Sequence, residues 1–356
     1  MNQQGTIGLR DDRAGWRQRG ASAWALSALL IGSYCVLYWT NWLDPVATAL
    51  GLRHKWFLYG ALYTLAMGFG AIGALRRHGN SRYQRIRIAV NVGVQAIFGF
   101  TIPFVLPLVD QPEAYLSYFW PLKLDALFPH SLAEMPMGLA VWSIGGSFIL
   151  APFAALIWGK RWYCSWICGC GGLANTFGDP WRHLSSRSPT AWRFEQVAVH
   201  ATLLIALLVT ALVWVGQLQG GAAGATGESA RSWYGFAVGS LLSGVIGTGL
   251  YPLLGPRTWC RYFCPMAAVL GLAQRAGRFR VAVQPGLCIA CGNCSTACEM
   301  GIDVRAYAMA DATFTRASCV GCGMCAHVCP RGVLRIESTT RLHPEYARAG
   351  HVVVDL

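Results

Sequence analysis

The chain has 356 residues, of which 54% are apolar and only 13% are charged. Soluble domains carry about a quarter charged residues, so this composition argues against an ordinary soluble protein and indicates a membrane protein with a smaller soluble part. The formal net charge is +13, which would fit nucleic-acid binding if the basic residues formed one patch. They are instead divided among the segments between apolar runs, so we expect no nucleic-acid partner.

The first 255 residues are predicted to form a membrane bundle. Residues 1–22 are polar and basic, and we expect them to form an N-terminal segment. Six apolar runs follow, each close to the ~20 residues that cross a bilayer core. They lie at about 23–42, 56–75, 88–109, 137–158, 197–215 and 234–254. We therefore predict a six-helix transmembrane domain over residues 23–255.

Two long segments between these runs differ in character. Residues 110–136 are aromatic and mildly acidic, and we expect a short interfacial helix there. Residues 217–232 are rich in Gly and Ala, a composition typical of a flexible loop.

Basic side chains gather at alternate ends of the apolar runs. One side carries fourteen of them, at Arg10, Arg13, Arg17, Arg19, Arg76, Arg77, Arg82, Arg85, Arg87, Lys160, Arg161, Arg182, Arg187 and Arg193. The other side carries four, at Arg53, Lys55, Lys123 and Arg231. Because basic segments stay in the cytoplasm, both termini are predicted to face the cytoplasm of a bacterial inner membrane. Much of the net charge would then contact membrane lipid.

The C-terminal third is predicted to be partly soluble. Residues 256–280 are basic and amphipathic, as expected of a linker at the membrane surface. Residues 281–338 are predicted to form a ferredoxin-like domain, with outer strands near 281–283 and 333–336, and residues 339–356 a tail. The expected fold is an α-helical membrane bundle followed by a C-terminal α+β ferredoxin domain with two [4Fe–4S] clusters.

Two four-cysteine runs indicate those clusters. They read Cys288-x2-Cys291-x2-Cys294-x3-Cys298 and Cys319-x2-Cys322-x2-Cys325-x3-Cys329. Bacterial ferredoxins bind [4Fe–4S] clusters through thiolates with this spacing. Zinc sites also use single C-x2-C pairs, but two compact runs in tandem favour iron–sulfur clusters. Cluster thiols must stay reduced, which again favours the cytoplasm.

The spacing also predicts which cysteines share a cluster. In two-cluster ferredoxins the fourth cysteine of each run ligates the other cluster. One set is therefore predicted to be Cys288, Cys291, Cys294 and Cys329, and the other Cys319, Cys322, Cys325 and Cys298. Cys329 is followed by Pro330 as in bacterial ferredoxins, whereas Cys298 is followed by Glu299, so its loop is expected to differ.

A second pair of cysteine motifs lies outside the ferredoxin region. Cys164-x3-Cys168 follows the fourth apolar run and is extended by Cys170, while Cys260-x3-Cys264 follows the sixth and ends in Pro265. Residues i and i+4 share a helix face, so two such pairs would supply a four-thiolate site for a third metal or iron–sulfur centre, with Cys170 as a substitute ligand. Reduced structural thiols and a redox-active disulfide are the alternatives.

Here the residues resemble a known family, the membrane polyferredoxins of the NapH/NosR type, which serve periplasmic nitrate and nitrous oxide reductases. The resemblance rests on the paired C-x3-C motifs after alternate spans and the two four-cysteine runs that follow. It implies a membrane-bound electron carrier, two [4Fe–4S] clusters and quinol as the electron donor. The first motif departs from the family's Cys-Pro ending, since it continues Cys168-Gly169-Cys170, and this leaves the partner reductase open.

Two functions from different classes follow. The first is an electron carrier or quinol dehydrogenase-like subunit that passes electrons between the quinone pool and a partner redox enzyme. The second is an assembly factor that uses cluster electrons to reduce a metal or thiol, as the related CcoG-type oxidase maturation proteins are thought to do. Asn91, Gln95 and Glu195 are candidates for lining a quinone site, although ordinary interhelical hydrogen bonds would also explain polar groups there.

Overall fold

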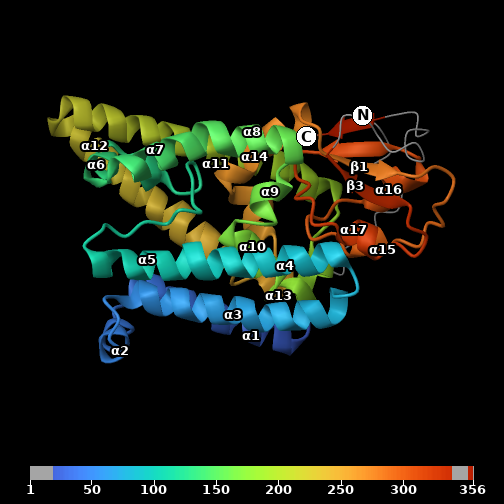
Figure 1. Ribbon diagram of the computed structural model, residues 1–356, viewed down its shortest axis with the longest axis horizontal. Coiled ribbons are helices and arrows are strands. Elements are labelled where there is room, and N and C mark those ends of the chain that lie inside the picture. The colour runs from blue at the N-terminus through green and yellow to red at the C-terminus, as the bar shows by residue number, and fades with distance from the viewer. Residues whose placement is uncertain (1–18, 339–351, 356) are drawn as a thin grey trace.

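The computed structural model describes residues 19–338 and 352–355. Figure 1 shows long helices lying side by side, with a small sheet-containing domain at one end of them. We call that end the ferredoxin end, because the two four-cysteine runs lie there. The opposite end carries the loops around α2 (Asp44–Ala49) and α6 (Pro129–Glu134).

The longer helical segments follow one another closely along the chain. They are α1 (Ala21–Trp39), α3 (Lys55–His78), α4 (Arg82–Val94), η3 (Gln95–Thr101), α5 (Ile102–Val105), η4 (Leu106–Val109), α7 (Met137–Gly145), η6 (Gly146–Leu150), α8 (Ala151–Trp158), α11 (Pro189–Gln219), α12 (Gly221–Tyr234) and η8 (Gly235–Ile246). Shorter segments between them are η5 (Leu124–Leu127), α9 (Arg161–Cys164), α10 (Gly169–Asn175), η7 (Asp179–Leu184), α13 (Tyr251–Leu254), η9 (Trp259–Phe263) and α14 (Pro265–Ala276).

Five helices of the described chain are long and apolar enough to cross a membrane. They are Ala21–Trp39, Lys55–His78, Arg82–Val109, Met137–Trp158 and Pro189–Gln219, which match the first five predicted runs. The sixth predicted run, 234–254, does not form a single helix of this kind. It is divided into η8 and α13 by a turn at residues 247–250.

The flexible loop predicted over 217–232 is wrong. Helix α11 continues to Gln219 and α12 begins at Gly221, so the two form a tight helical hairpin. Glycine makes this close approach feasible: a Cβ on Gly227 would lie 2.8 Å from the carbonyl oxygen of Leu212. Small residues that looked like loop composition instead allow the backbones of two helices to meet.

The segment 110–136 folds back into the bundle. It contains the short helices η5 and α6, in keeping with the interfacial helix expected there. Two hydrogen bonds anchor it from the inside: the indole of Trp120 donates to Thr210 at 3.0 Å, and Tyr163, outside the segment, donates to the carbonyl of Ser117 at 2.8 Å. The part from 114 to 128 therefore helps to close the interior beside α11, whereas α6 has no buried residue.

The ferredoxin-like domain has both strands predicted from sequence, but of the two only β3 lies at an edge of the sheet, whereas β1 lies inside it. β1 (Arg280–Val283) pairs antiparallel with β3 (Leu334–Glu337), and on its other side with β2 (Thr313–Arg316). A further strand, β4 (Val352–Asp355), pairs parallel with β2 and completes the order β3-β1-β2-β4. The short helices α15 (Asn293–Thr296), α16 (Val304–Met309) and α17 (Met324–His327) complete the domain, α15 and α17 each holding the third cysteine of a run.

The ferredoxin-like domain is bonded to the bundle at many points. Tyr83 donates from its hydroxyl to the carbonyl of Gly321 at 2.9 Å, and Gln84 donates to the carbonyl of Cys322 at 2.9 Å. Ser165 donates to the carbonyl of Val320 at 2.7 Å. Helix α14 is buried against α8 and α11, so the 256–280 segment is part of the core between bundle and domain.

Candidate iron–sulfur sites and an adjoining chamber

The first predicted cysteine set surrounds one small pocket. Cys288, Cys291, Cys294 and Cys329 all line it, together with Pro330 and Arg305. The structure therefore brings the fourth cysteine of the second run beside the first three of the first run. Thiols of this number and type fit a [4Fe–4S] cluster.

The second predicted set is more deeply enclosed. Burial raises the pKa of Cys319 to about 12, with the neighbouring sulfurs of Cys298 and Cys322 adding to the effect. Burial likewise raises the pKa of Cys325, and the charges of the Cys322, Cys319 and Cys298 sulfurs act in the same direction. The charges of these sulfurs thus act on one another. That Cys319, Cys322, Cys325 and Cys298 share one cluster stays a prediction. A bound metal would supply the positive charge that keeps such thiols ionised.

The two loops are copies of each other. Gly292 and Gly323, each following the second cysteine of a run, both have positive φ (79° and 75°), and so do Gly301 and Gly332 after the fourth cysteine. Residues with φ in this range turn the backbone sharply. The turn brings successive cysteines to the same side of the chain, which suits a shared cluster.

The C-x3-C motifs also come together in the interior. Cys164, Cys168, Cys260 and Cys264 are all buried and belong to one hydrophobic core. Cys164 ends α9 and Cys260 lies in η9, while Cys168 and Cys264 are the residues that precede α10 and α14. All fourteen cysteines are free thiols, so the structure contains no disulfide between the two motifs.

The two motifs are built alike. Gly159 and Gly255 precede them, end the helices α8 and α13, and share an unusual conformation (φ 73°, ψ 177° and φ 91°, ψ 166°). Cys164 and Cys260 follow these glycines at the same distance along the chain, and Cys168 and Cys264 then open a new helix. The structure thus repeats one helix–turn–helix unit, with two thiols on each copy.

Electrostatics differ among the five thiols of this region. The Cys170 thiol donates to Cys168 and lowers its pKa to about 7, and the N–H groups of Gly171 and Cys170 act in the same direction. Burial raises the pKa of Cys164, Cys260 and Cys264. Buried thiols that favour the neutral form require a cation before they can act together as ligands.

The described residues offer no site for a single metal ion. Within 19–338 and 352–355, no group of three or more His, Cys, Asp and Glu side chains is arranged to hold one metal ion. The all-thiol composition of each set fits an iron–sulfur cluster, which is larger than an ion and spreads its ligands.

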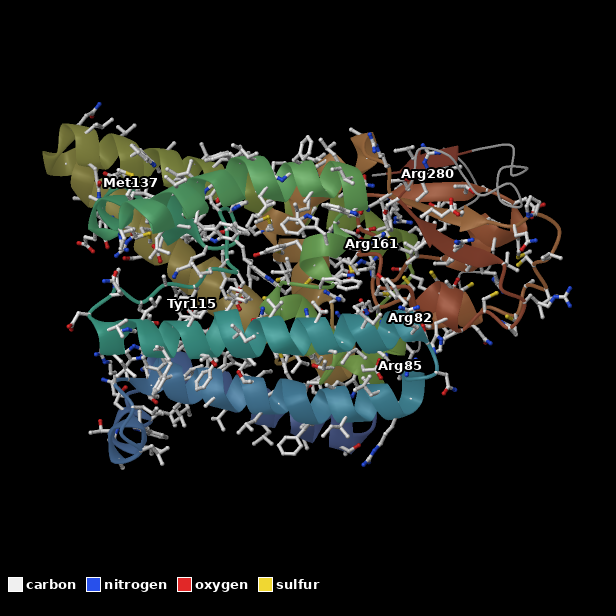
Figure 2. All side chains as sticks on the ribbon, viewed as in Figure 1. Arg82, Arg85, Tyr115, Met137, Arg161 and Arg280 are labelled. Carbon is white, nitrogen blue, oxygen red and sulfur yellow. The ribbon has the colours of Figure 1, made fainter. Side chains whose placement is uncertain are left out.

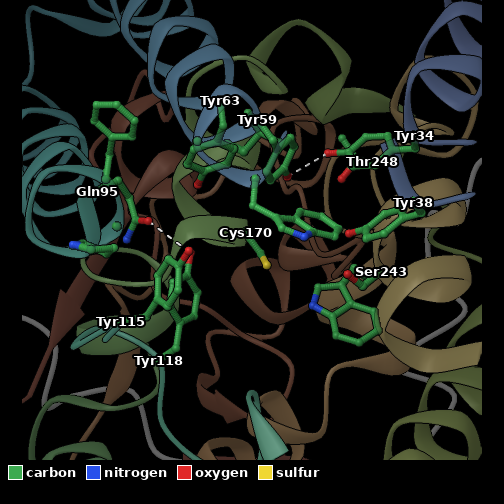
Figure 3. Close-up of a pocket in the computed structure, with 18 of the residues that line it drawn as sticks. Tyr34, Tyr38, Tyr59, Tyr63, Gln95, Tyr115, Tyr118, Cys170, Ser243 and Thr248 are labelled. Carbon is green, nitrogen blue, oxygen red and sulfur yellow. Dashed lines mark hydrogen bonds between the residues drawn. The ribbon is translucent and has the colours of Figure 1, made fainter. Parts of the chain in front are cut away.

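A chamber of about 280 Å³ adjoins the C-x3-C group (Figure 3). Its wall contains Cys260, Trp259 and Cys170, and the Cys170 sulfur points into it. Seven tyrosines line the rest, namely Tyr34, Tyr38, Tyr59, Tyr63, Tyr115, Tyr118 and Tyr251. None of the described residues lining it is a Lys, Arg, Asp or Glu. A neutral, flat molecule with hydrogen-bonding oxygens fits such a wall.

Two polar groups of the chamber show its chemistry. Gln95 accepts from the hydroxyl of Tyr118 at 3.3 Å and donates to the carbonyl of Ile167 at 2.5 Å, next to Cys168. The hydroxyl of Tyr63 is buried and has no hydrogen-bond partner among the described residues. A buried hydroxyl without a partner is costly, which is expected where a ligand supplies one.

The three polar candidates from sequence have separate surroundings. Only Gln95 lines the chamber. Asn91 is buried, and its side-chain amide has no partner in the described part of the chain. Glu195 forms an ion pair with Arg261 at 2.6 Å, so it serves the packing of η9 against α11. The sequence reasoning missed the tyrosines, although Tyr34–Tyr38 and Tyr59–Tyr63 have the i, i+4 spacing that marks one helix face.

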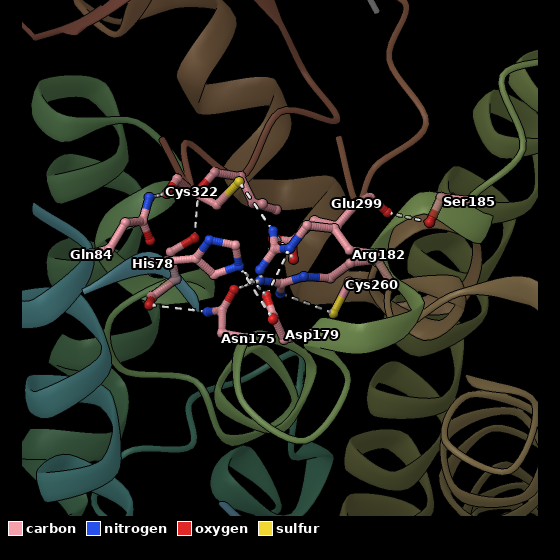
Figure 4. Close-up of polar contacts among 12 residues, drawn as sticks. His78, Gln84, Asn175, Asp179, Arg182, Ser185, Cys260, Glu299 and Cys322 are labelled. Atoms are coloured by element: carbon pink, nitrogen blue, oxygen red, sulfur yellow. Dashed lines mark hydrogen bonds and ion pairs between the residues drawn. The ribbon is translucent and has the colours of Figure 1, made fainter. Parts of the chain in front are cut away.

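A buried ionic network joins the cysteine sites (Figure 4). Glu299 lies between Arg182 and Arg257, with an ion pair of 2.8 Å to each. Burial alone would raise the pKa of Glu299, but the charges of Arg182 and Arg257, together with Arg87, outweigh it and lower this pKa to about 2. Glu299 therefore carries a negative charge in the interior.

Family models match both cysteine regions. A 4Fe-4S dicluster domain matches residues 287–334, and a 4Fe-4S binding domain matches twice, at 140–188 and 236–284. The second model thus covers the two C-x3-C motifs and agrees with the structural repeat.

Two curated proteins are distantly similar. One is the putative electron transport protein YccM of Escherichia coli, 24% identical over 162 residues, which are 41% of this chain and 43% of that protein. The other is the methylamine utilization ferredoxin-type protein MauN of Methylobacillus flagellatus, 28% identical over 200 residues, which are 54% of this chain and 62% of that protein. The chain thus spans less than two thirds of either relative, and no solved structure matches it. It is accordingly an iron–sulfur protein with 4Fe–4S domains of the ferredoxin type.

Proposed function

We propose that this chain is a membrane-bound electron-transfer protein that passes electrons between a quinone pool and a partner redox protein. One observation carries the proposal: the aromatic chamber shares Cys170, Trp259 and Cys260 with the buried C-x3-C group. A molecule in the chamber would therefore lie against the wall of a thiol site. The electron-transport and ferredoxin names of the two relatives support the same reading.

The proposal includes three iron–sulfur clusters. Cys164, Cys168, Cys260 and Cys264 would hold one, and the two ferredoxin sets the others. When bound, clusters accept and release single electrons, with potentials set by charge and hydrogen bonds around the sulfurs. The chain's own residues hold the thiols in a dry interior. They also hold neighbouring cysteine sites side by side, since Ser165, next to Cys164, donates to the carbonyl of Val320, next to Cys319.

The chamber residues would bind and orient a quinone head group. Aromatic rings stack on a flat ring, while Gln95 and the hydroxyl of Tyr63 can bond to its oxygens. The absence of charged side chains from the described wall suits a neutral ligand. Oxidation of a quinol would also release protons, which must leave by hydroxyl and carboxylate groups connected to the chamber.

The basic side chains support the proposed orientation. In Figure 2, Arg82, Arg85 and Arg161 lie toward the ferredoxin end, whereas Tyr115 and Met137 lie toward the opposite end. The positive-inside rule then supports a cytoplasmic ferredoxin domain in the inner membrane of a bacterium, with both termini in the cytoplasm. The chamber would open toward the bilayer interior or the outer face.

The test is performed on protein purified without oxygen and returned to liposomes. Three clusters predict about twelve irons per chain, whereas two predict about eight. Addition of a short-chain quinol should bleach the cluster absorbance and produce electron paramagnetic resonance (EPR) signals of reduced clusters. No reduction by ubiquinol or menaquinol analogues, with chemically reducible clusters present, would overturn the quinone assignment.

One observation favours a second candidate, an assembly factor that reduces a metal or thiol. The Cys170 sulfur points into the chamber and is not required for a four-thiol site. A soft metal such as copper could bind it. Copper or disulfide reduction by the reduced protein, without any quinol response, would support this candidate over the first.

A further inference from the structure

Glu299 connects two cysteine sites through two arginines. Arg257 donates to the sulfur of Cys260 at 3.7 Å, and Arg182 donates to the sulfur of Cys322 at 3.8 Å. Each of these arginines is also paired with Glu299, one on each carboxylate oxygen. The carboxylate therefore lies between a membrane-domain thiol and a ferredoxin thiol.

All three charged groups are inside the protein. Glu299 is fully buried, Arg257 is 1% exposed and Arg182 is 5% exposed. Buried ion pairs add little net stability compared with apolar residues of similar volume, because desolvation offsets their attraction. Stability alone therefore does not explain why the chain carries this triad between two cysteine sites.

The position of Glu299 in the sequence is also distinctive. It directly follows Cys298, at the place where Pro330 follows Cys329 in the second run. Its backbone carbonyl accepts a hydrogen bond from Ser185 at 2.6 Å, which fixes it against η7 of the bundle. The change from Pro to Glu gives this loop a carboxylate that reaches both arginines.

We propose that Glu299 is a positioning residue that holds Arg182 and Arg257 on the sulfurs of two different clusters and thereby sets the reduction potentials of both. The assignment to Cys260 rests on the third cluster of the proposed function, whereas the assignment to Cys322 does not. Reduction adds negative charge to a cluster, so a nearby guanidinium raises its potential and a nearby carboxylate lowers it.

The two arginines are not equally dependent on Glu299. Arg182 also pairs with Asp179 at 3.2 Å, and Asp179 is itself paired with Arg77 and His78. Arg257 has Asn175 and the carbonyl of Cys164 as its other described oxygen partners, both uncharged. Loss of the Glu299 charge should therefore affect the Cys260 cluster more than the Cys322 cluster.

The experiment is an EPR-monitored redox titration of the full chain in detergent, with iron content measured on the same samples. Glu299→Gln keeps a side-chain oxygen that can accept from the arginines but removes the carboxylate charge. It should therefore raise both potentials, and for the Cys260 cluster by the equivalent of at least tenfold in the reduction equilibrium, which is about 59 mV for one electron. Arg257→Gln should lower mainly the reduction potential of the Cys260 cluster, and Arg182→Gln mainly that of the Cys322 cluster. Glu299→Asp keeps the charge, so its cluster potentials should remain closer to those of the wild type.

The control is Glu228→Gln, which removes an exposed carboxylate on α12, far from the clusters, where it pairs with Arg231. It should leave both potentials unchanged. In a wild type with about twelve irons, unchanged potentials in Glu299→Gln with full iron content, or a shift in only one of the two clusters, would overturn the proposal. If Glu299→Gln loses iron, Arg257→Gln and Arg182→Gln are compared with the wild type instead. Wild-type potentials of both clusters in these two variants, with full iron content, would overturn the proposal. About eight irons in the wild type would contradict the third cluster and the proposed function that includes it. The proposal would then concern the Cys322 cluster alone, and an unchanged potential of that cluster in Glu299→Gln would overturn it.

Discussion

Gln274 of α14 donates a hydrogen bond to the backbone carbonyl of Cys319 at 3.0 Å. The same side chain donates to the carbonyl of Arg316 at 2.8 Å and accepts from the backbone N–H of Lys160 at 2.7 Å. It is fully buried. One amide thus ties the turn before Cys164 to the first cysteine of the second run, so the bundle and the ferredoxin-like domain share a single rigid core.

Gln274→Leu should loosen this connection. The substitution removes the Gln274 partners of the Lys160 N–H and the Cys319 carbonyl, each loss costing about 1–3 kcal/mol. The Arg316 carbonyl keeps its bond from the N–H of Cys319. We expect a lower thermal midpoint and faster loss of iron from the second-run cluster, measured by absorbance during heating. Gln219→Leu, at the exposed end of α11, is the matched control and should change neither. Equal stability of the two variants would contradict a structural role for Gln274.

Cys298→Ala tests the exchange of ligands between the two runs. If Cys298 completes the set with Cys319, Cys322 and Cys325, its loss should remove or convert that cluster and leave the first-run cluster intact. EPR of the reduced variant should then keep the signal of the cluster held by Cys288, Cys291, Cys294 and Cys329. Selective loss of that signal instead would show that each run holds its own cluster.

The sequence predicted the chemistry of this protein better than its shape. The spacing of the cysteine runs predicts which cysteines share a cluster, because cluster ligation requires that spacing. The structure places Cys329 beside Cys288, as expected for the first set. The C-x3-C pairs were expected to meet, and Arg257 contacts both motifs, at the carbonyl of Cys164 and the sulfur of Cys260. Helix α12 was missed because glycines such as Gly227 are typical of loops. Only the structure shows that this glycine is needed for close packing against Leu212 of α11. The chamber was missed because its tyrosines come from four separate stretches of chain, which only the tertiary fold brings together.

The hairpin of α11 and α12 offers a test of close packing. In Gly227→Ala, the new methyl would lie 2.8 Å from the carbonyl oxygen of Leu212, so the helices must separate. Overpacking of this kind costs about 1–3 kcal/mol. Gly239→Ala is the control, because a Cβ there meets nothing within 4 Å and Ala favours a helix by about 1 kcal/mol over Gly. Urea unfolding in detergent should show a lower free energy of unfolding than the wild type for Gly227→Ala and a higher one for Gly239→Ala.

Tyr63→Phe tests the quinone chamber without changing its shape. The Tyr63 hydroxyl has no partner in the described structure, so its removal should not weaken the fold. If it bonds to a quinol, its loss should raise the KM for quinol about fivefold, the effect of one hydrogen bond of about 1 kcal/mol. Iron content should remain that of the wild type. Tyr262→Phe, outside the chamber and packed on Phe194, should leave the KM unchanged. A wild-type KM in both variants would exclude Tyr63 as a ligand.

Glu113 is connected to the chamber by a hydrogen bond from Tyr115. Tyr115, which lines the chamber, donates to Glu113 at 2.5 Å, and Glu113 contacts the half-exposed His54 at 3.2 Å. Burial, together with the bond to Glu113, raises the pKa of Tyr115, so this phenol stays protonated and can only pass a proton by exchanging it with its neighbours. These three groups form a path from the chamber to the end of the bundle opposite the ferredoxin-like domain.

Glu113→Gln should therefore slow proton release rather than electron acceptance by the clusters. We expect a lower kcat for quinol oxidation with unchanged cluster potentials, since Glu113 lies at the end remote from the cysteines. In liposomes with the ferredoxin-like domain outward, a trapped pH dye should report acidification of the lumen in the wild type and much less in the variant. Glu228→Gln, an exposed carboxylate at the same end, should behave as the wild type. Acidification of the outer medium instead would mean that protons leave on the ferredoxin side, and the path through Tyr115 would be wrong.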